Sequence, residues 1–251
     1  AGGGAVAVGV SAGATYFEGT AVAGIGGSGT ISNVAIVSVK TNGETSAIVA
    51  AATIGGGAVA VNAGMALAIN RTTTKTFIGD GVTINATDVV LNTDFQADVT
   101  SIIIGVTGGG VAVGVSVAIA INCPSAYTYI GVDSAGGSDA SVKGTVNADT
   151  VTMNSNFRGD TLVFGVSVAA GGVAVNGLVA LGFNRITNQT GINRANVTAR
   201  VIDLDGIITG RTEVYATSVI GGAVAVGATV AVAQIKTDNR VFIDTTGAAI
   251  H

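Results

Sequence analysis

Few residues in this chain combine the types and spacings that chemistry requires. The closest approach to a catalytic pair is Asp203-Leu204-Asp205, where two carboxylates flank one apolar residue. Alternation in an extended strand would place both acids on one face, and paired acids serve glycoside hydrolysis in many enzymes. No other segment of the chain carries a matching acidic cluster. We interpret the pair as part of a solvated strand face, and it leaves a polysaccharide-cleaving enzyme open as an alternative.

Nucleophilic and metal chemistry have too few candidate residues. The only histidine is His251, and the only cysteine is Cys123, which stands beside Pro124 with no histidine close in sequence. One histidine at the last position cannot complete a Ser-His-Asp or Cys-His arrangement. The His and Cys ligand sets of metal centres are missing as well. We therefore predict no enzymatic activity, no catalytic residues, no metal site and no cofactor.

A glycine-rich segment imitates two known binding motifs. Gly24-Ile25-Gly26-Gly27-Ser28-Gly29 fits the dinucleotide fingerprint, with Glu44 placed where an acid would contact the ribose. The fingerprint works only where a helix starts at the last glycine, whereas the strand-like segment Ile31–Val39 follows here. The same glycines nearly fit the nonapeptide calcium repeat, but an isoleucine stands where the liganding Asp belongs. We predict neither nucleotide nor calcium binding.

The composition excludes other classes of partner and indicates strands. Hydrophobic residues make up 48% of the chain and charged residues 10%, with a formal net charge of −4. No run of Lys or Arg could follow a phosphate backbone, so we expect no nucleic-acid partner. Residues 99–132 are uncharged and long enough to span a bilayer as a helix. Glycines and β-branched residues oppose a helix there, so we predict a buried strand pair joined by a glycine-rich corner, without membrane insertion.

A degenerate repeat of about 52 residues covers the whole chain. The segment that follows Gly110 has relatives that begin near Val6, Val59, Val173 and Val224, at spacings of 53, 52, 62 and 51 residues. The intervening halves align at the same spacings. The excess length of the third copy falls on residues 132–139, which form a loop by composition. We expect one segment of a longer repeat protein, with copies near 1–53, 54–106, 107–168, 169–219 and 220–251.

Hydrophobic side chains alternate within each copy with a period of two, which is the period of a β-strand. Large residues occupy one face and small residues the other, as in Val111-Ala112-Val113-Gly114-Val115-Ser116. No single coil can bury its Val/Ile row, but stacked coils share hydrogen bonds and align equivalent side chains. We predict an all-β, right-handed parallel β-helix, or β-solenoid. A 52-residue unit exceeds the usual solenoid repeat, so we expect about two coils per repeat and about nine coils in total.

The small-residue face is the surface that the sequence singles out for interaction. It is flat and almost uncharged, and an extended apolar patch of this kind marks a contact with a neighbouring chain or segment. We predict weak self-association through it. Its candidate residues are Ala112, Gly114, Ser116, Ala118, Ala120 and Ala180. Asn70, Asn122 and Asn184 occupy equivalent repeat positions, and we interpret them as amides stacked at coil corners.

The repeat pattern resembles that of very large bacterial exoproteins. The segment Gly109–Asn122, followed by Tyr129-Ile130-Gly131 and by Val146–Asn154, is similar to repeats of leukotoxin-type filamentous adhesins and of the wider filamentous-haemagglutinin-like group. The likeness spans essentially the whole chain. It implies export by a two-partner or autotransporter route, a long stalk at the bacterial surface, and a role in adhesion or toxicity.

The expected role is therefore structural. We expect a stalk or adhesin segment of a secreted or surface-attached exoprotein, which holds a binding region away from the cell. A host-cell or surface receptor is the partner that the resemblance implies. The alternatives are a carbohydrate-active β-helix enzyme, with Asp203 and Asp205 as its candidate acids, and an outer-membrane β-barrel segment. The absence of Trp and the 4% of aromatic residues count against the barrel, whose interfacial girdles need aromatics.

Overall fold

A computed structural model describes residues 2–132, 143–244 and 249–251. Every regular element in these ranges is a β-strand, and the strands form one parallel sheet. No helix of the described chain is long and apolar enough to cross a membrane. The strands are β1 (Gly2–Ile25), β2 (Gly29–Ile78), β3 (Val82–Asn122), β4 (Ser125–Gly131), β5 (Thr145–Asn193), β6 (Asn196–Gly221) and β7 (Val224–Asp244).

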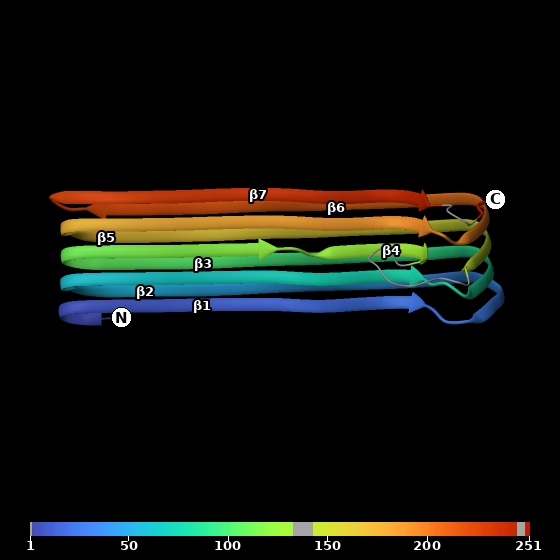
Figure 1. Cartoon of the computed structure of the whole chain (residues 1–251), viewed down its shortest axis with the longest axis horizontal. Helices are drawn as coiled ribbons and strands as arrows, with labels where there is room; N and C mark the ends of the chain where they lie inside the picture. Colours follow the sequence, from blue (N-terminus) through green and yellow to red (C-terminus); the bar gives the residue numbers. More distant parts are fainter. Residues whose placement is uncertain (1, 133–142, 245–248) are drawn as a thin grey trace.

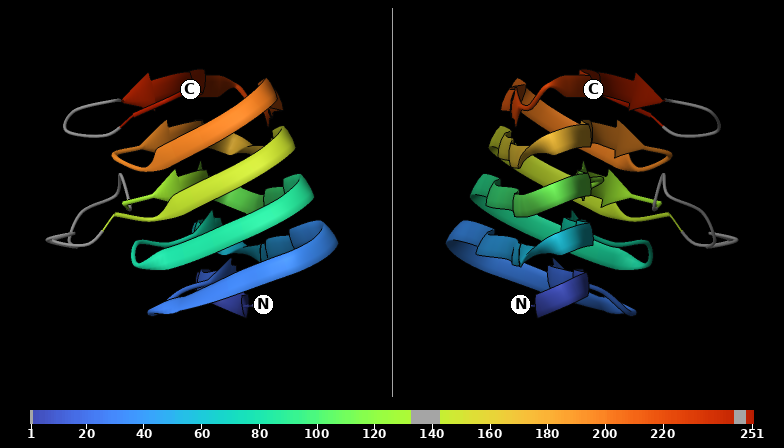
Figure 2. Two further views of the ribbon diagram at one scale, coloured as in Figure 1. Left: turned by 90° about the vertical axis from the view of Figure 1, so that its right-hand side faces the viewer. Right: turned by 90° about the vertical axis from the view of Figure 1, so that its left-hand side faces the viewer.

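The longest strands fold back on themselves, which gives the molecule two layers (Figure 1). β2, β3 and β5 each run along one layer, bend at a cluster of glycines and return along the other. Layer 1 contains residues 29–54, 82–106 and 145–168 together with β6. Layer 2 contains β1, residues 58–78, 111–131 and 173–193, and β7. The view along the strands shows the same turn repeated in the stacking direction (Figure 2).

Glycine is required at the bend because successive turns stack there without room for a side chain. A Cβ atom on Gly109 would collide with the carbonyl oxygen of Gly57, and a Cβ on Gly171 would collide with that of Gly109. At the opposite end of the layers, Gly27 and Gly81 turn the chain with φ angles of 95° and 77°. Such positive values favour glycine because it lacks a Cβ. The predicted glycine-rich corner within residues 99–132 is confirmed as the bend of β3.

The register of the sheet shows that one repeat makes one turn. Each residue pairs with its counterpart in the next repeat, so Val6, Val59, Val111, Val173 and Val224 form a single column across the ladder. The prediction of two coils per repeat is therefore wrong, and so is the total of nine coils. A turn holds the full repeat because each of its two layers contributes an unusually long extended segment. Layer 2 contains five such passes and layer 1 contains four.

The repeat alignment itself is confirmed residue by residue. Ladder partners across layer 1 follow the predicted equivalences, as in the columns Ile84–Val146–Val197, Leu91–Met153–Leu204 and Phe95–Phe157–Ile208. The spacings read from the sequence are therefore hydrogen-bonded registers of the sheet. The loop predicted at residues 132–139 lies outside the described residues, apart from Val132.

Small side chains fill most of the space between the layers, and large ones face outward along much of layer 2. Ala118 and Ala120 are fully buried, whereas Val115 on the same strand is 47% exposed. The layers lie too close for large residues to meet inside: a Cβ on Gly13 would stand 2.9 Å from Val49 Cγ2, and one on Gly182 would stand 2.9 Å from Val214 Cγ2. The two faces predicted from the sequence exist, but their orientation is the reverse of the expected one.

Large apolar side chains reach the interior mainly near the end opposite the glycine bends. The largest buried cluster there includes Ile84, Leu91, Ile130, Met153 and Ile192, which come from three different strands. Between this cluster and the alanine-rich middle, the rings of Phe95 and Phe157 pack with centroids 5.6 Å apart. Burial in this part of the fold therefore follows the usual preference for large hydrophobic residues.

Candidate interaction surfaces

The interaction face predicted from the sequence lies inside the molecule. Ala112, Ala118, Ala120 and Ala180 are fully buried and Ser116 is 1% exposed, and Gly114 belongs to the same inward row. These residues contact the opposite layer of their own chain, so they cannot form a surface for a partner. The alternation of large and small residues is the same for either orientation. Only the distance between the two layers decides which face is covered.

The equivalent asparagines also lie inside, where they join the two layers. Asn70, Asn122 and Asn184 are ladder partners, as the repeat predicted. The Nδ2 atom of Asn122 donates to the carbonyl oxygen of Ala97 at 2.7 Å, and that of Asn184 donates to the carbonyl oxygen of Gly159 at 2.7 Å. The interpretation as corner amides is therefore wrong. The amides bridge the two layers about midway along the passes of layer 2.

The large residues of layer 2 form an exposed surface that we call the outer apolar wall. Its middle pass consists of Val111, Val113, Val115, Val117, Ile119 and Ile121. The wall comprises these six residues and their ladder partners in the other four passes of layer 2. All of these positions carry hydrophobic residues or glycine, except Gln234 in the last pass. No position of the wall is charged.

A smaller apolar strip lies on the outer face of layer 1, also beside the glycine bends. It includes Ile104, Phe164 and Tyr215, which are 41%, 39% and 52% exposed. The strip covers fewer passes than the outer apolar wall and contains a charged residue, Glu213, in its last pass. Both outer faces become polar towards the other end of the layers. The outer faces are thus apolar near the glycine bends and mostly polar near the opposite turns, where Ile36 and Ile207 are exposed exceptions.

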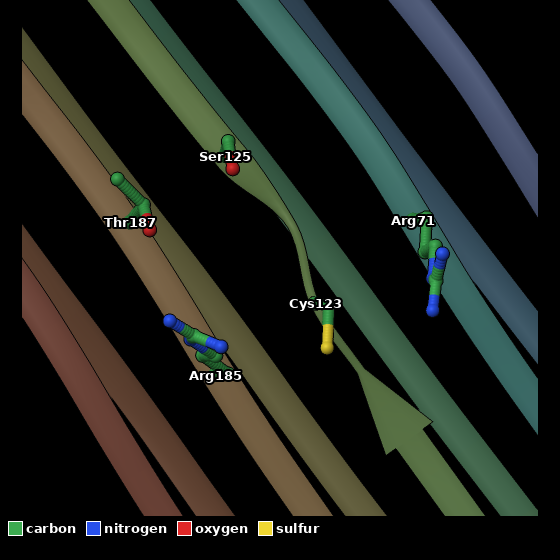
Figure 3. Close-up of a pocket in the computed structure, with 5 residues that line it drawn as sticks. All are labelled: Arg71, Cys123, Ser125, Arg185 and Thr187. Atoms are coloured by element: carbon green, nitrogen blue, oxygen red, sulfur yellow. The ribbon is translucent and has the colours of Figure 1, made fainter.

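The polar half of layer 2 contains a shallow basic pocket beside the outer apolar wall. Arg71, Cys123, Ser125, Arg185 and Thr187 line a cavity of about 320 Å³ (Figure 3). Arg71 comes from β2, Arg185 comes from β5, and Cys123 lies between them in the connection from β3 to β4. Guanidinium groups bind carboxylates, sulfates and phosphates through paired hydrogen bonds. This arrangement suits an anionic group at the surface.

The positively charged residues of the pocket continue into the next pass of layer 2. Lys236 of β7 is the ladder partner of Arg185 and lines two adjoining cavities. Arg240 follows on the same strand and forms an ion pair with Asp238 at 2.8 Å. This surface was not predicted from the sequence, because Arg71, Arg185 and Lys236 are far apart in the chain. The signal was present, since Arg71 and Arg185 each follow one of the equivalent asparagines.

Cys123 is the one thiol in the sequence, and its surroundings make it a weaker acid than an ordinary cysteine. Partial burial raises the pKa of the Cys123 thiol above its ordinary value, and the positive charges of Arg71 and Arg185 oppose this rise in part. Because the net effect is a raised pKa, the thiol stays protonated at neutral pH. Because the thiolate is the reactive form, the pocket does not activate a nucleophile.

The acidic pair and the glycine-rich segment that the sequence singled out both lie in or beside strands. Asp203 and Asp205 point outward from β6, and their ladder partners are Thr152 and Asn154. Among the described residues, no group of three or more His, Cys, Asp or Glu side chains is placed to hold a metal ion. The glycine-rich segment at residues 24–29 leads into strand β2, so the helix that the dinucleotide fingerprint needs is replaced by a strand.

Comparison with protein-family models, with curated proteins and with solved structures finds no match for this chain.

Proposed function

We propose that the chain is a structural stalk segment of a secreted or surface-attached bacterial exoprotein, with an adhesive role and no catalysis. The observation that carries the proposal is the parallel ladder in which each repeat pairs with the next over both layers. Such a ladder extends by adding identical turns, so length increases without any new fold. An extendable rod is what a surface stalk requires. The resemblance to filamentous adhesins supports the same role.

The proposed solenoid is right-handed. Each turn is a strand, a crossover and a second strand parallel to the first in the same sheet. Connections of this type are right-handed in almost all proteins, because the strand twist favours that hand.

Adhesion is proposed through the basic pocket and its extension along the column. Arg71, Arg185 and Lys236 present positive charge on a chain whose formal net charge is −4. Local positive charge on an acidic protein attracts acidic groups of a receptor while the remainder of the surface repels them. The partner that this chemistry fits is an acidic group on a host-cell or other receptor surface.

Localisation tests the proposal most directly. Antibodies raised against the purified chain are applied to intact cells of the organism that encodes it, and in parallel to permeabilised cells. We expect labelling of intact cells, and loss of the label after brief treatment with an external protease. Labelling that appears only after permeabilisation, in culture conditions where the protein is produced, would contradict a surface role. An antibody against a cytoplasmic protein serves as the control for cell integrity.

A further inference from the structure

We infer that the outer apolar wall is the interface between two copies of this chain. The wall is exposed and free of charge on all five passes of layer 2. Val111, Val173 and Val175 are 38%, 40% and 40% exposed even in the inner passes, where neighbouring turns cover part of each side chain. Continuous apolar patches of this size are rare on proteins that remain monomeric. This inference does not depend on the proposed surface role.

The size of the wall matches that of a stable dimer interface. Five passes at about 4.8 Å and eleven residues at about 3.3 Å give a surface of roughly 24 by 36 Å. Packing two such walls would cover about 850 Å² on each copy, close to the 800 Å² typical of specific interfaces. Flat sheets pack face to face through interdigitating side chains, and the Val, Ile, Leu and Ala residues of the wall suit that contact.

The charges beside the wall select the orientation of the two copies. The adjoining column contains Glu18, Arg71, Arg185 and Lys236. A two-fold axis along the strands would bring Arg71 against Arg185 of the partner subunit and Glu18 against Lys236 of the partner subunit. Each column has three positive charges and one negative charge, so the two columns would repel each other overall. A two-fold axis along the stacking direction would place each charged column beyond the glycine bends of the other copy. The strands of the two copies then run in opposite directions, and the charges remain at the solvated rim.

Charge substitutions on one outer face test the interface. Met65→Glu and Val115→Glu place a carboxylate within the wall, and Thr73→Glu places one on the polar half of the same face. Met65 and Val115 are 42% and 47% exposed in the single chain, so these changes do not bury a charge in the monomer. Sedimentation equilibrium should show a dimer for the unmodified chain, dissociation constants raised at least ten-fold by the wall variants, and an unchanged constant for Thr73→Glu. Circular dichroism checks folding in every case.

Cross-linking tests the orientation and keeps the inference falsifiable if a charge variant fails to fold. In a Cys123→Ser background, Val113→Cys chains are mixed with Ile119→Cys chains. A short bismaleimide reagent is used because packed sheets lie about 10 Å apart, which is beyond the reach of a disulfide. The inferred orientation predicts cross-linked heterodimers, since Val113 faces Ile119 of the partner subunit. Efficient cross-linking of Val113→Cys chains alone would mean the opposite orientation.

Two results would overturn the inference. The first is a monomeric chain at micromolar concentration, or equal association of all the variants. The second is flotation of the unmodified chain with neutral phosphatidylcholine vesicles that Met65→Glu abolishes, with no dimer in solution. The second result would assign the wall to lipid.

Discussion

Leu178 on β5 occupies the space opposite Gly165 of the same strand. A Cβ atom on Gly165 would stand 2.9 Å from Leu178 Cδ1, so the leucine fits only because the facing residue has no side chain. One repeat earlier, the ladder partners of these residues are Ile103 and Ser116, with the large residue on the other layer. Between these two adjacent turns, the large residue of the pair thus changes layer.

The first prediction concerns variants in which the pair Gly165 and Leu178 is replaced by the residue types found one repeat earlier. Gly165→Ile alone should destabilise the protein by about 1–3 kcal/mol, because overpacking forces the side chains and backbone apart. Adding Leu178→Ser recreates the pair found at Ile103 and Ser116, and it should restore most of the loss. Urea unfolding of the single and double variants measures both effects. Additive losses in the double variant would show that the two residues do not share one space.

The second prediction concerns the buried amide of Asn122. Asn122→Ala should lower the free energy of unfolding by about 1–3 kcal/mol, because the carbonyl oxygen of Ala97 loses its 2.7 Å donor in the interior. Asn92→Ala is the matched control, since Asn92 lies on the outer face of the same strand. Its effect should stay within about 0.5 kcal/mol. Equal effects in denaturant unfolding would argue against a bridging role for the buried amide.

The third prediction tests one turn per repeat. Deleting residues 59–110 joins Ala58 to Val111, which is the ladder partner of Val59, so the register is preserved. The shortened protein should fold and unfold cooperatively, with a loss of stability from one missing turn. Deleting residues 59–84 removes about half a turn and should abolish folding, whereas it would be tolerated if each repeat formed two coils. Circular dichroism during heating distinguishes the two outcomes.

The fourth prediction concerns Cys123. Burial raises the pKa of its thiol, so alkylation by neutral iodoacetamide should reach half its maximal rate at a higher pH than for a free cysteine. Replacing Arg71 and Arg185 by Gln should move that midpoint higher still, because both guanidinium groups favour the thiolate. A profile unchanged in the double variant would mean that the two arginines lie too far from the sulfur to act on it.

The same shift has a consequence for stability. A raised pKa in the folded state means that folding holds the proton more tightly than the unfolded chain does. The contribution is complete below the ordinary thiol pKa and is lost as the pH rises through the raised value. The unfolding midpoint of the native chain should therefore fall more between neutral and alkaline pH than that of Cys123→Ser.

The sequence by itself determined the strands, the repeat and the register. Period-two alternation requires extended chain, and a spacing such as that from Val59 to Val111 became the ladder because equivalent residues stack best on each other. The glycine clusters marked the bends because a Cβ on Gly109 or Gly171 would collide with the equivalent bend one repeat earlier. These features depend on residues that are near in sequence or that recur at a fixed interval.

Only the tertiary structure decided how much chain fills one turn and which face is inside. Alternation has the same pattern whether Val115 or Ser116 points inward, and the distance between the layers settles the choice by excluding large residues where the two layers meet. That distance depends on pairs such as Gly165 and Leu178, which no local pattern identifies. The basic pocket depended on the turn length too, because one turn per repeat places Arg71, Cys123 and Arg185 side by side.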